Sequence, residues 1–219
     1  MLARKRMIET IKTETKYTRR MTGQDSLDSG VIEVMRRVPR EEFVPAGVKG
    51  FAYNDSPLSI GCGQTISQPF IVALMTDLLQ PQADDVILEV GTGSGYQAAI
   101  LSQLVKQVYS IEVIKQLAGE ASEVLQRLGY LNVELKVGDG AQGWQEHAPY
   151  DGIIVTAAAP FVPQPLIDQL KPHARLVIPV GQPYLSQALL LIEKDENGAI
   201  STRDILDVVF VPLVNGSGT

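Results

Sequence analysis

Cysteine and tryptophan each occur only once in this 219-residue chain, and histidine occurs twice. Cys62 is the sole cysteine, so no disulfide can form within the chain, which fits a reducing compartment. His147 and His173 are too few and too scattered to predict a metal site. No apolar run approaches the ~20 residues that a membrane span requires, and no signal-peptide pattern opens the sequence. We therefore expect a cytoplasmic protein with no metal and no membrane partner.

Positive charge is also in short supply. The formal net charge is −6, whereas a nucleic-acid partner normally requires a basic face, so we expect no nucleic-acid partner. The exception is residues 1–20, where seven Lys and Arg stand against Glu9 and Glu14. Such a run is either a solvated helix face or a functional basic arm. With 45% hydrophobic residues the chain can bury one sizeable core, and we expect a single domain and a monomer.

Three common catalytic motifs are missing as well. The sequence has no Gly-x-x-x-x-Gly-Lys phosphate loop, no His-Glu-x-x-His helix and no Gly-x-Ser-x-Gly elbow, since Gly93 stands where the serine would be. A phosphate-loop nucleotidase, a zinc protease and a serine hydrolase are therefore disfavoured.

A glycine-rich turn is the most informative feature that is present. The apolar run 86–90 contains an acid, Glu89, and is followed by Gly91, Gly93, Ser94 and Gly95 before a new apolar period begins. A buried strand, a glycine turn and a helix start form the opening unit of nucleotide-binding α/β folds. The acid followed by Gly-x-Gly-x-Gly is the pattern of S-adenosylmethionine-dependent methyltransferases, in which such an acid can help bind the ammonium of the cofactor.

Two alternatives to that interpretation stay open. The shifted frame Gly93-x-Gly95-x-x-Ala98 fits the looser dinucleotide pattern of an oxidoreductase. The glycines and the acid could also serve packing alone.

Three further positions support a nucleoside ligand. Glu112 ends the predicted strand 107–113, about 20 residues beyond the turn, where an acid can accept hydrogen bonds from ribose hydroxyls. Asp139, followed by Gly140, comes after the strand 133–137 and can receive an adenine amino group. Thr156 ends another predicted strand. Because ligands of open α/β sheets bind at the carboxyl ends of the strands, we expect Glu89, Glu112, Asp139 and Thr156 to converge there.

The order of predicted elements gives the fold class. Residues 1–45 are predicted as helices that break near residues 22–23, with the second helix over 26–37; residues 46–68 form a loop-rich segment with short strands. From residue 69 helices and strands alternate, which indicates right-handed crossovers and an α/β, doubly wound, mostly parallel Rossmann-like sheet of about seven strands. Helices are predicted over 70–79, 96–105, 114–128 and 163–170, and strands over 86–90, 107–113, 133–137, 152–156, 175–180, 188–193 and 206–211. We expect the last two strands to form an antiparallel hairpin around residues 195–198.

The segment 53–70 is polar and glycine-rich, and it ends where a helix is predicted to start. Pro69 suits the first helical turn, so Ser67 or Gln68 is expected at the N-cap.

Several motifs of this chain occur together, and in this order, in one enzyme family. They are Val38-Pro39-Arg40-Glu41, Phe43-Val44-Pro45, Asp55-x-Pro57-x-x-Ile60-Gly61, Thr65-Ile66-Ser67-Gln68-Pro69, the glycine turn 88–97, Gly138-Asp139-Gly140, residues 151–158, Pro179-Val180-Gly181 and Phe210-Val211-Pro212-Leu213. Across residues 31–214 the chain resembles the protein-L-isoaspartate O-methyltransferases, class I S-adenosylmethionine-dependent enzymes that repair damaged proteins and peptides.

The resemblance implies an activity and a set of site residues. The expected activity is methyl esterification of the α-carboxylate of L-isoaspartyl residues, which initiates conversion to L-aspartyl through a succinimide. Ser67 would be the catalytic residue. Asp55, Pro57, Ile60, Val211 and Leu213 would bind the substrate, and Thr65, Ile66 and Gln68 would lie along S-adenosylmethionine with Glu89, the glycine turn, Glu112, Asp139, Gly140 and Thr156. The first 30 residues depart from the family pattern by being longer and more basic, which leaves the packing of residues 1–25 open. A further alternative is a non-catalytic relative that binds the cofactor or partner proteins with its basic N-terminal arm.

Overall fold

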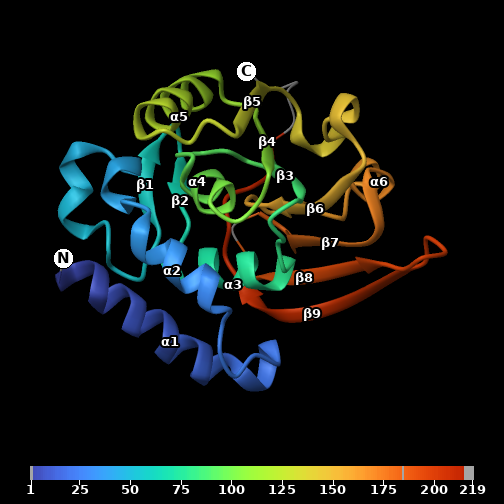
Figure 1. Ribbon diagram of the computed structural model, residues 1–219, viewed down its shortest axis with the longest axis horizontal. Helices are drawn as coiled ribbons and strands as arrows, with labels where there is room; N and C mark the ends of the chain where they lie inside the picture. Colours follow the sequence, from blue (N-terminus) through green and yellow to red (C-terminus); the bar gives the residue numbers. More distant parts are fainter. Residues whose placement is uncertain (1, 184, 215–219) are drawn as a thin grey trace.

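The computed structural model describes residues 2–183 and 185–214. Its centre is a seven-stranded sheet in the order β5-β4-β3-β6-β7-β8-β9 (Figure 1). The strands are β3 (Val86–Val90), β4 (Gln107–Glu112), β5 (Val133–Val137), β6 (Tyr150–Val155), β7 (Leu170–Val180), β8 (Gln187–Lys194) and β9 (Ile200–Val208). β3 to β7 pair in parallel, and β8 and β9 add antiparallel strands at one edge. The chain order reverses at β3, whose neighbours are β4 and β6, and this is where open α/β sheets bind ligands.

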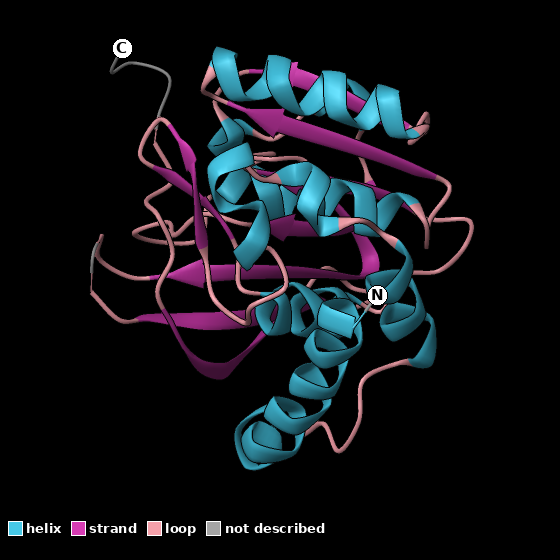
Figure 2. Ribbon diagram, turned by 90° about the vertical axis from the view of Figure 1, so that its left-hand side faces the viewer, coloured by secondary structure: helices cyan, strands magenta, loops and turns pink. Residues whose placement is uncertain are grey.

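Helices cover both faces of this sheet, because its strands are apolar on both sides. In β3, Ile87 belongs to a core shared with α1 to α5, whereas Leu88 belongs to a second core that includes Leu166 of α6. Figure 2 shows the helices stacked against the strands. The helices are α1 (Leu2–Thr22), α2 (Ser29–Arg37), α3 (Pro69–Leu79), α4 (Tyr96–Ser102), α5 (Lys115–Leu128) and α6 (Gln164–Asp168). Short 3₁₀ helices are η1 (Arg40–Phe43), η2 (Ala46–Phe51), η3 (Gly140–Gln142) and η4 (Gln145–His147).

A separate two-stranded antiparallel hairpin, β1 (Leu58–Gly61) and β2 (Gln64–Ile66), precedes α3. Its inward side chains, Ile60 and Ile66, are buried, and the terminal methyl of Ile60 lies 3.4 Å from where a Cβ on Gly93 would be. The hairpin therefore packs against the glycine turn that follows β3.

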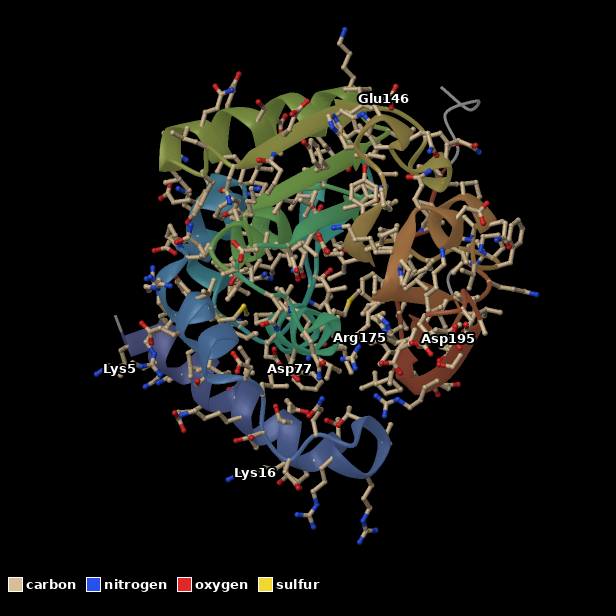
Figure 3. All side chains as sticks on the ribbon, turned by 45° about the vertical axis from the view of Figure 1, so that its right-hand side comes forward. Lys5, Lys16, Asp77, Glu146, Arg175 and Asp195 are labelled. Carbon is tan, nitrogen blue, oxygen red and sulfur yellow. The ribbon has the colours of Figure 1, made fainter. Side chains whose placement is uncertain are left out.

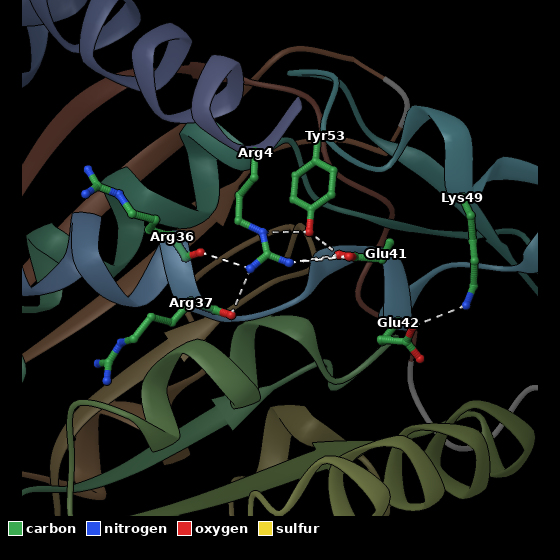
Figure 4. A network of polar contacts seen from close by, with 7 residues as sticks. All are labelled: Arg4, Arg36, Arg37, Glu41, Glu42, Lys49 and Tyr53. Carbon is green, nitrogen blue, oxygen red and sulfur yellow. Dashed lines mark hydrogen bonds and ion pairs between the residues drawn. The ribbon is translucent and has the colours of Figure 1, made fainter. Parts of the chain in front are cut away.

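The N-terminal helix α1 packs across α2, α3 and β9. Its buried face carries Met7, Ile8 and Ile11, while Lys5 and Lys16 extend outward from the other face (Figure 3). Near its start, the Arg4 side chain donates to the Tyr53 hydroxyl at 2.9 Å, to the Glu41 carboxylate at 3.3 Å, and to two main-chain carbonyls at the end of α2 (Figure 4). These contacts fix α1 to the segment that leads into residues 46–68.

The predicted sheet and its N-terminal helical extension are confirmed, and the hairpin between β8 and β9 turns at residues 195–198 as expected. The predicted start of the second helix is wrong by three residues, since the Asp28 carboxylate caps it by accepting from Gly30 and Val31. The predicted bounds of the last strand are also wrong. β9 begins at Ile200 and carries the polar residues 201–204 along an exposed edge, so it lacks the apolar alternation that marks a half-buried strand.

Residues after β9 leave the sheet and return to the loop that follows β6. The amide of Ala158 donates to the Val211 carbonyl, and the amide of Leu213 donates to the Ala158 carbonyl, both at 2.8 Å. This pairing brings the C-terminal segment 211–214 to the carboxyl edge of the parallel strands.

Candidate active site

Two cavities adjoin at the carboxyl edge of the sheet. The first is lined by residues 64–67, Val72, residues 90–94, Tyr96, Gln97, residues 111–114, Gly140, Thr156, Ala157 and residues 211–214. The second has a volume of about 450 Å³ and is lined by Pro57, Thr65, Ser67, Gln68, Ile71, Thr156, Ser186 and residues 207–211. Four residues, Thr65, Ser67, Thr156 and Val211, line both cavities. A group transferred between ligands in the two cavities would pass beside these four.

The glycine turn forms one wall of the first cavity. Gly91 has a φ of 94°, and a Cβ there would lie 2.6 Å from the Thr156 hydroxyl oxygen. Its amide bonds the Ile111 carbonyl at 2.8 Å, which holds the turn close to the end of β4. Gly93 and Ser94 also line this cavity, whereas Gly95 does not, because it packs against Ala121 and Leu125 of α5. Gly95 therefore allows close helix packing. The Gly-x-Gly-x-Gly spacing alone does not distinguish this role from contact with a ligand.

Glu112 lies where the strand pattern predicts, at the end of β4 and in the wall of the first cavity. One carboxylate oxygen accepts from the Gly93 amide at 2.8 Å and the other from the Ile114 amide at 2.9 Å. These bonds fix the carboxylate, and each oxygen keeps a further lone pair for a hydroxyl donor. A ribose diol fits this acceptor.

Glu89 does not line either cavity. Its side chain is fully buried behind the glycine turn, one carboxylate oxygen accepts from the Ser110 hydroxyl, and the other has no partner among the described residues. The Ser110 hydroxyl also bonds Thr92, which does line the first cavity. Burial raises the pKa of Glu89 to about 8. Glu89 is therefore connected to the first cavity through Ser110 and Thr92, and its expected part in binding the ammonium of a cofactor, directly or through water, remains a prediction.

The remaining expected cofactor residues are only partly in the first cavity. Gly140 lines it, and a Cβ there would lie 2.4 Å from a methyl of Val90. Asp139 stands beside it without lining the cavity, and its carboxylate caps η3 by accepting from Ala141 at 2.9 Å. Thr156 lines both cavities, and its hydroxyl donates to the Gly91 carbonyl. The two main-chain turns after β3 and β6 are thus held to one another.

Ser67 lies between β2 and α3 and faces both cavities. Its carbonyl accepts from the Arg40 guanidinium at 2.8 Å, and its hydroxyl has no hydrogen bond within the described ranges. Thr65 and Ile66 also line the first cavity. Gln68 is the N-cap residue of α3, but it lines the second cavity instead of the first.

The expected substrate residues divide in the same way. Pro57 and Val211 line the second cavity, whereas Leu213 lines the first and Ile60 packs on the glycine turn. Asp55 lines neither cavity. Its carboxylate accepts from the Phe70 amide and from the Gln68 side chain, each at 2.8 Å, and so caps α3 from a distant segment.

Sequence reasoning missed other residues around the two cavities. Val113 and Ile114 follow Glu112 directly, and Gln97 adjoins the glycine turn, so their place in the chain was a usable signal. Ser186, Asp207 and Val208 were not foreseeable, because only the antiparallel strands β8 and β9 bring them to the second cavity. No group of His, Cys, Asp and Glu suited to a metal ion occurs within residues 2–183 and 185–214. Nor does any helix in these ranges have the length and apolar character needed to cross a bilayer.

A glycine turn after the first parallel strand, an acid ending the next strand and a ligand cavity at the chain reversal define a Rossmann-like nucleoside-binding protein. The model of the protein-L-isoaspartate(D-aspartate) O-methyltransferase (PCMT) family matches residues 15–218, and the chain belongs to this family.

Relatives and solved structures agree with this assignment. The chain is 58% identical over 213 residues to protein-L-isoaspartate O-methyltransferase 2 of Nitrosococcus oceani, covering 97% of each chain. It is 57% identical over 214 residues to the enzyme of the same name from Syntrophobacter fumaroxidans, covering 98% of this chain and 87% of that one. A solved protein-L-isoaspartate O-methyltransferase superposes with a TM-score of 0.84 at 27% identity, covering 98% of this chain and 67% of the other. A Plasmodium falciparum chain described as a putative member of this family was solved with S-adenosyl-L-homocysteine. It superposes with a TM-score of 0.74 at 27% identity, covering 93% of this chain and 97% of the other.

Proposed function

We propose that this chain methylates the α-carboxylate of L-isoaspartyl residues in damaged proteins and peptides, with S-adenosylmethionine as methyl donor. The observation that carries the proposal is the position of Ser67 in the lining of both cavities, one of which is also lined by the glycine turn and Glu112. The family match and the relatives at 57% and 58% identity support the same activity.

The first cavity fits the cofactor on its own chemistry. The Gly91–Ser94 main chain can approach a ligand closely, and the fixed Glu112 carboxylate is an acceptor for a ribose diol. Thr65 and Ile66 line the same cavity. When bound there, S-adenosylmethionine supplies an electrophilic methyl group on a sulfonium. In this proposal the cofactor residues are Thr65, Ile66, Gly91, Gly93, Ser94, Glu112, Gly140 and Thr156, with Glu89 acting from behind.

The second cavity would hold the isoaspartyl residue. A carboxylate is already ionised at pH 7, so its reaction with a methyl donor needs no general base, which suits a site without histidine. The free hydroxyl of Ser67 would donate to this carboxylate and orient it. Because alignment of two bound reactants can be worth about 7–11 kcal/mol, we assign most of the acceleration to the walls shared by the two cavities.

The product is a methyl ester that closes to a succinimide without the enzyme, and hydrolysis of the succinimide returns some L-aspartyl linkage. The proposed role is therefore repair, with isoaspartyl proteins as partners. The net charge of −6 favours protein over nucleic-acid substrates, and the lone Cys62 is compatible with the reducing cytoplasm. A monomer suffices, since both cavities are lined by one chain.

The test is transfer of radiolabelled methyl from S-adenosylmethionine to two peptides that differ only in an isoaspartyl or an aspartyl linkage. We expect base-labile label on the isoaspartyl peptide alone. Label on both peptides, or on neither while adenosylhomocysteine still binds, would contradict the proposed acceptor and leave the cofactor cavity intact.

A further inference from the structure

A fully buried arginine lies directly behind the candidate active site. Arg40, the first residue of η1, has no exposed surface. Its Nε donates to the Ala52 carbonyl at 2.7 Å, and one terminal nitrogen donates to the Ser67 carbonyl at 2.8 Å. Its guanidinium carbon lies 4.9 Å from the centre of the Tyr96 ring. The other terminal nitrogen is buried and has no partner in the part of the chain that the structure describes.

This cation is not neutralised by an ion pair. Within the described residues no carboxylate lies within 4.0 Å of its nitrogens. The nearby carboxylate of Asp55 is committed to Phe70 and Gln68 at the start of α3. Removing a charge from water without pairing it is costly, and an apolar side chain of similar volume is often the more stable choice. Stability alone therefore does not account for an arginine at this position.

The three contacts of Arg40 come from three different segments around the site. Ala52 precedes the loop that contains Pro57 in the second cavity. Ser67 lines both cavities, and Tyr96 lines the first at the start of α4. One planar guanidinium thus holds the main chain at Ala52 and at Ser67 and lies over the Tyr96 ring, a geometry that the compact ammonium of lysine cannot reproduce.

We propose that Arg40 is a positioning residue for methyl transfer: it fixes the main chain at Ser67, and its unpaired positive charge favours an anionic carboxylate beside that serine. The inference rests on the proposed function and adds to it a source of selectivity for a charged acceptor. Arg40 acts from behind Ser67 and lines neither cavity. The low dielectric around a buried charge strengthens its interaction with a second charge.

The experiment compares Arg40→Lys, Arg40→Met and the wild type in three measurements. Binding of adenosylhomocysteine reports the integrity of the first cavity. Steady-state kinetics with an isoaspartyl peptide separate kcat from KM. Competition between that peptide and its α-carboxamide analogue reports selectivity for charge. Arg20→Met is the matched control, because Arg20 is exposed on α1.

In Arg40→Met we expect adenosylhomocysteine binding to persist while the preference for the carboxylate falls by about tenfold or more, as for the loss of one charge-assisted interaction. Arg40→Lys should keep most of the preference for the carboxylate, because lysine retains the positive charge. Its kcat should fall, because the ammonium lacks the planar set of donors of a guanidinium. Arg20→Met should behave as the wild type.

An unchanged carboxylate preference in Arg40→Met, with adenosylhomocysteine still bound, would overturn the charge selection. If Arg40→Met does not bind adenosylhomocysteine, Arg40→Gln takes its place, since it is uncharged and keeps donors for the two carbonyls. An unchanged kcat in Arg40→Lys would overturn the positioning role. Failure of the wild type to methylate the isoaspartyl peptide would instead contradict the proposed function itself.

Discussion

At the scale of single residues, the site is built from side chains whose hydrogen bonds to the main chain are already made. Glu112, Asp55 and Asp139 each accept from backbone amides, and Thr156 donates to a backbone carbonyl. Ser67 differs, because its hydroxyl has no such bond in the described residues. A hydroxyl without an internal partner at the junction of two cavities is available to a ligand.

For Ser67→Ala we therefore expect methyl transfer to an isoaspartyl peptide to fall by about 10–100-fold, the range for loss of a hydrogen bond of roughly 1.5–3 kcal/mol to a charged group. Binding of adenosylhomocysteine should survive, since the glycine turn and Glu112 are untouched. Single-turnover kinetics and calorimetry measure the two quantities. Ser201→Ala, exposed on β9, is the control, and equal activity in both variants would remove Ser67 from the catalytic role.

Glu89 gives a prediction about pH. Burial raises its pKa in the folded chain to about 8, from an ordinary value of 4.5. Between these values the folded chain holds a proton that the unfolded chain has released, so stability falls as the pH rises through this range. The stabilising contribution of the protonated carboxyl is fully present below pH 4.5 and lost as the pH passes 8.

Glu89→Gln should remove this dependence, because glutamine stays neutral in both states. The melting temperature of the variant should rise relative to that of the wild type as the pH increases between the two pKa values. In a domain of this size, each kcal/mol of unfolding free energy changes the melting temperature by roughly 2–4 °C. Thermal melts of the two unliganded proteins across that range provide the measurement, and a constant difference would show that Glu89 does not titrate there.

At the scale of elements, the sequence predicted strands and helices best where apolar periodicity and turn residues agree. The bounds of β3 and β5 coincide with the predicted ones, as does the glycine turn between β3 and α4. The edge strand β9 was predicted poorly because polar residues fill its exposed first half. From the order of elements and the family resemblance we also predict a functional division of the single domain. Residues 1–45 would be N-terminal helices, residues 46–68 a substrate loop segment and residues 69–219 the cofactor-binding core.

Sequence could place the candidate site at a sheet edge but not assign each residue to its cavity. Gln68 was expected along the cofactor and Leu213 at the substrate, and both roles remain predictions. The structure places Gln68 in the second cavity and Leu213 in the first, because the position of each side chain depends on how β2 and the C-terminal segment 211–214 pack. Arg40 lies in the motif Val38-Pro39-Arg40-Glu41, yet no sequence pattern reveals that a cation is wholly buried. These facts arise from tertiary contacts between segments far apart in the chain.

The glycine turn itself can be tested as an element. Gly91→Ala and Gly198→Ala both place a side chain at positive φ, 94° and 83°, at a cost of roughly 1–2 kcal/mol each. Only at Gly91 would the new methyl also meet the Thr156 hydroxyl, because nothing lies within 4 Å of a Cβ on Gly198.

We expect Gly91→Ala to lower the free energy of unfolding more than Gly198→Ala does and to weaken adenosylhomocysteine binding, whereas Gly198→Ala leaves binding intact. Urea denaturation and calorimetry decide. Equal losses of stability with unchanged binding in both variants would show that the close approach at Gly91 is not required.

At the scale of the whole molecule, α1 is a basic helix in a protein whose net charge is negative. The helix carries seven Lys and Arg against two Glu, although the net charge of the chain is −6. The family model begins at residue 15, within this helix, so the first half of α1 lies outside the segment that the family model matches. Its inner face nevertheless joins the larger hydrophobic core through Met7, Ile8 and Ile11.

This arrangement predicts that α1 is a structural part of the fold and not a detachable basic arm. Ile11 is completely buried, so Ile11→Ala should cost about 2–5 kcal/mol of unfolding free energy, as truncations in a packed core do. Lys16→Ala, on the exposed face of the same helix, should change the free energy of unfolding by no more than about 0.5 kcal/mol. α1 is hydrogen-bonded through Arg4 to Tyr53 and packs on α3, the helix that Ser67 precedes. We therefore expect Ile11→Ala to unfold in one cooperative transition, at a lower urea concentration than the wild type. Urea denaturation followed by far-ultraviolet circular dichroism and by adenosylhomocysteine binding measures this, and an early transition of α1 that leaves binding unchanged would contradict it.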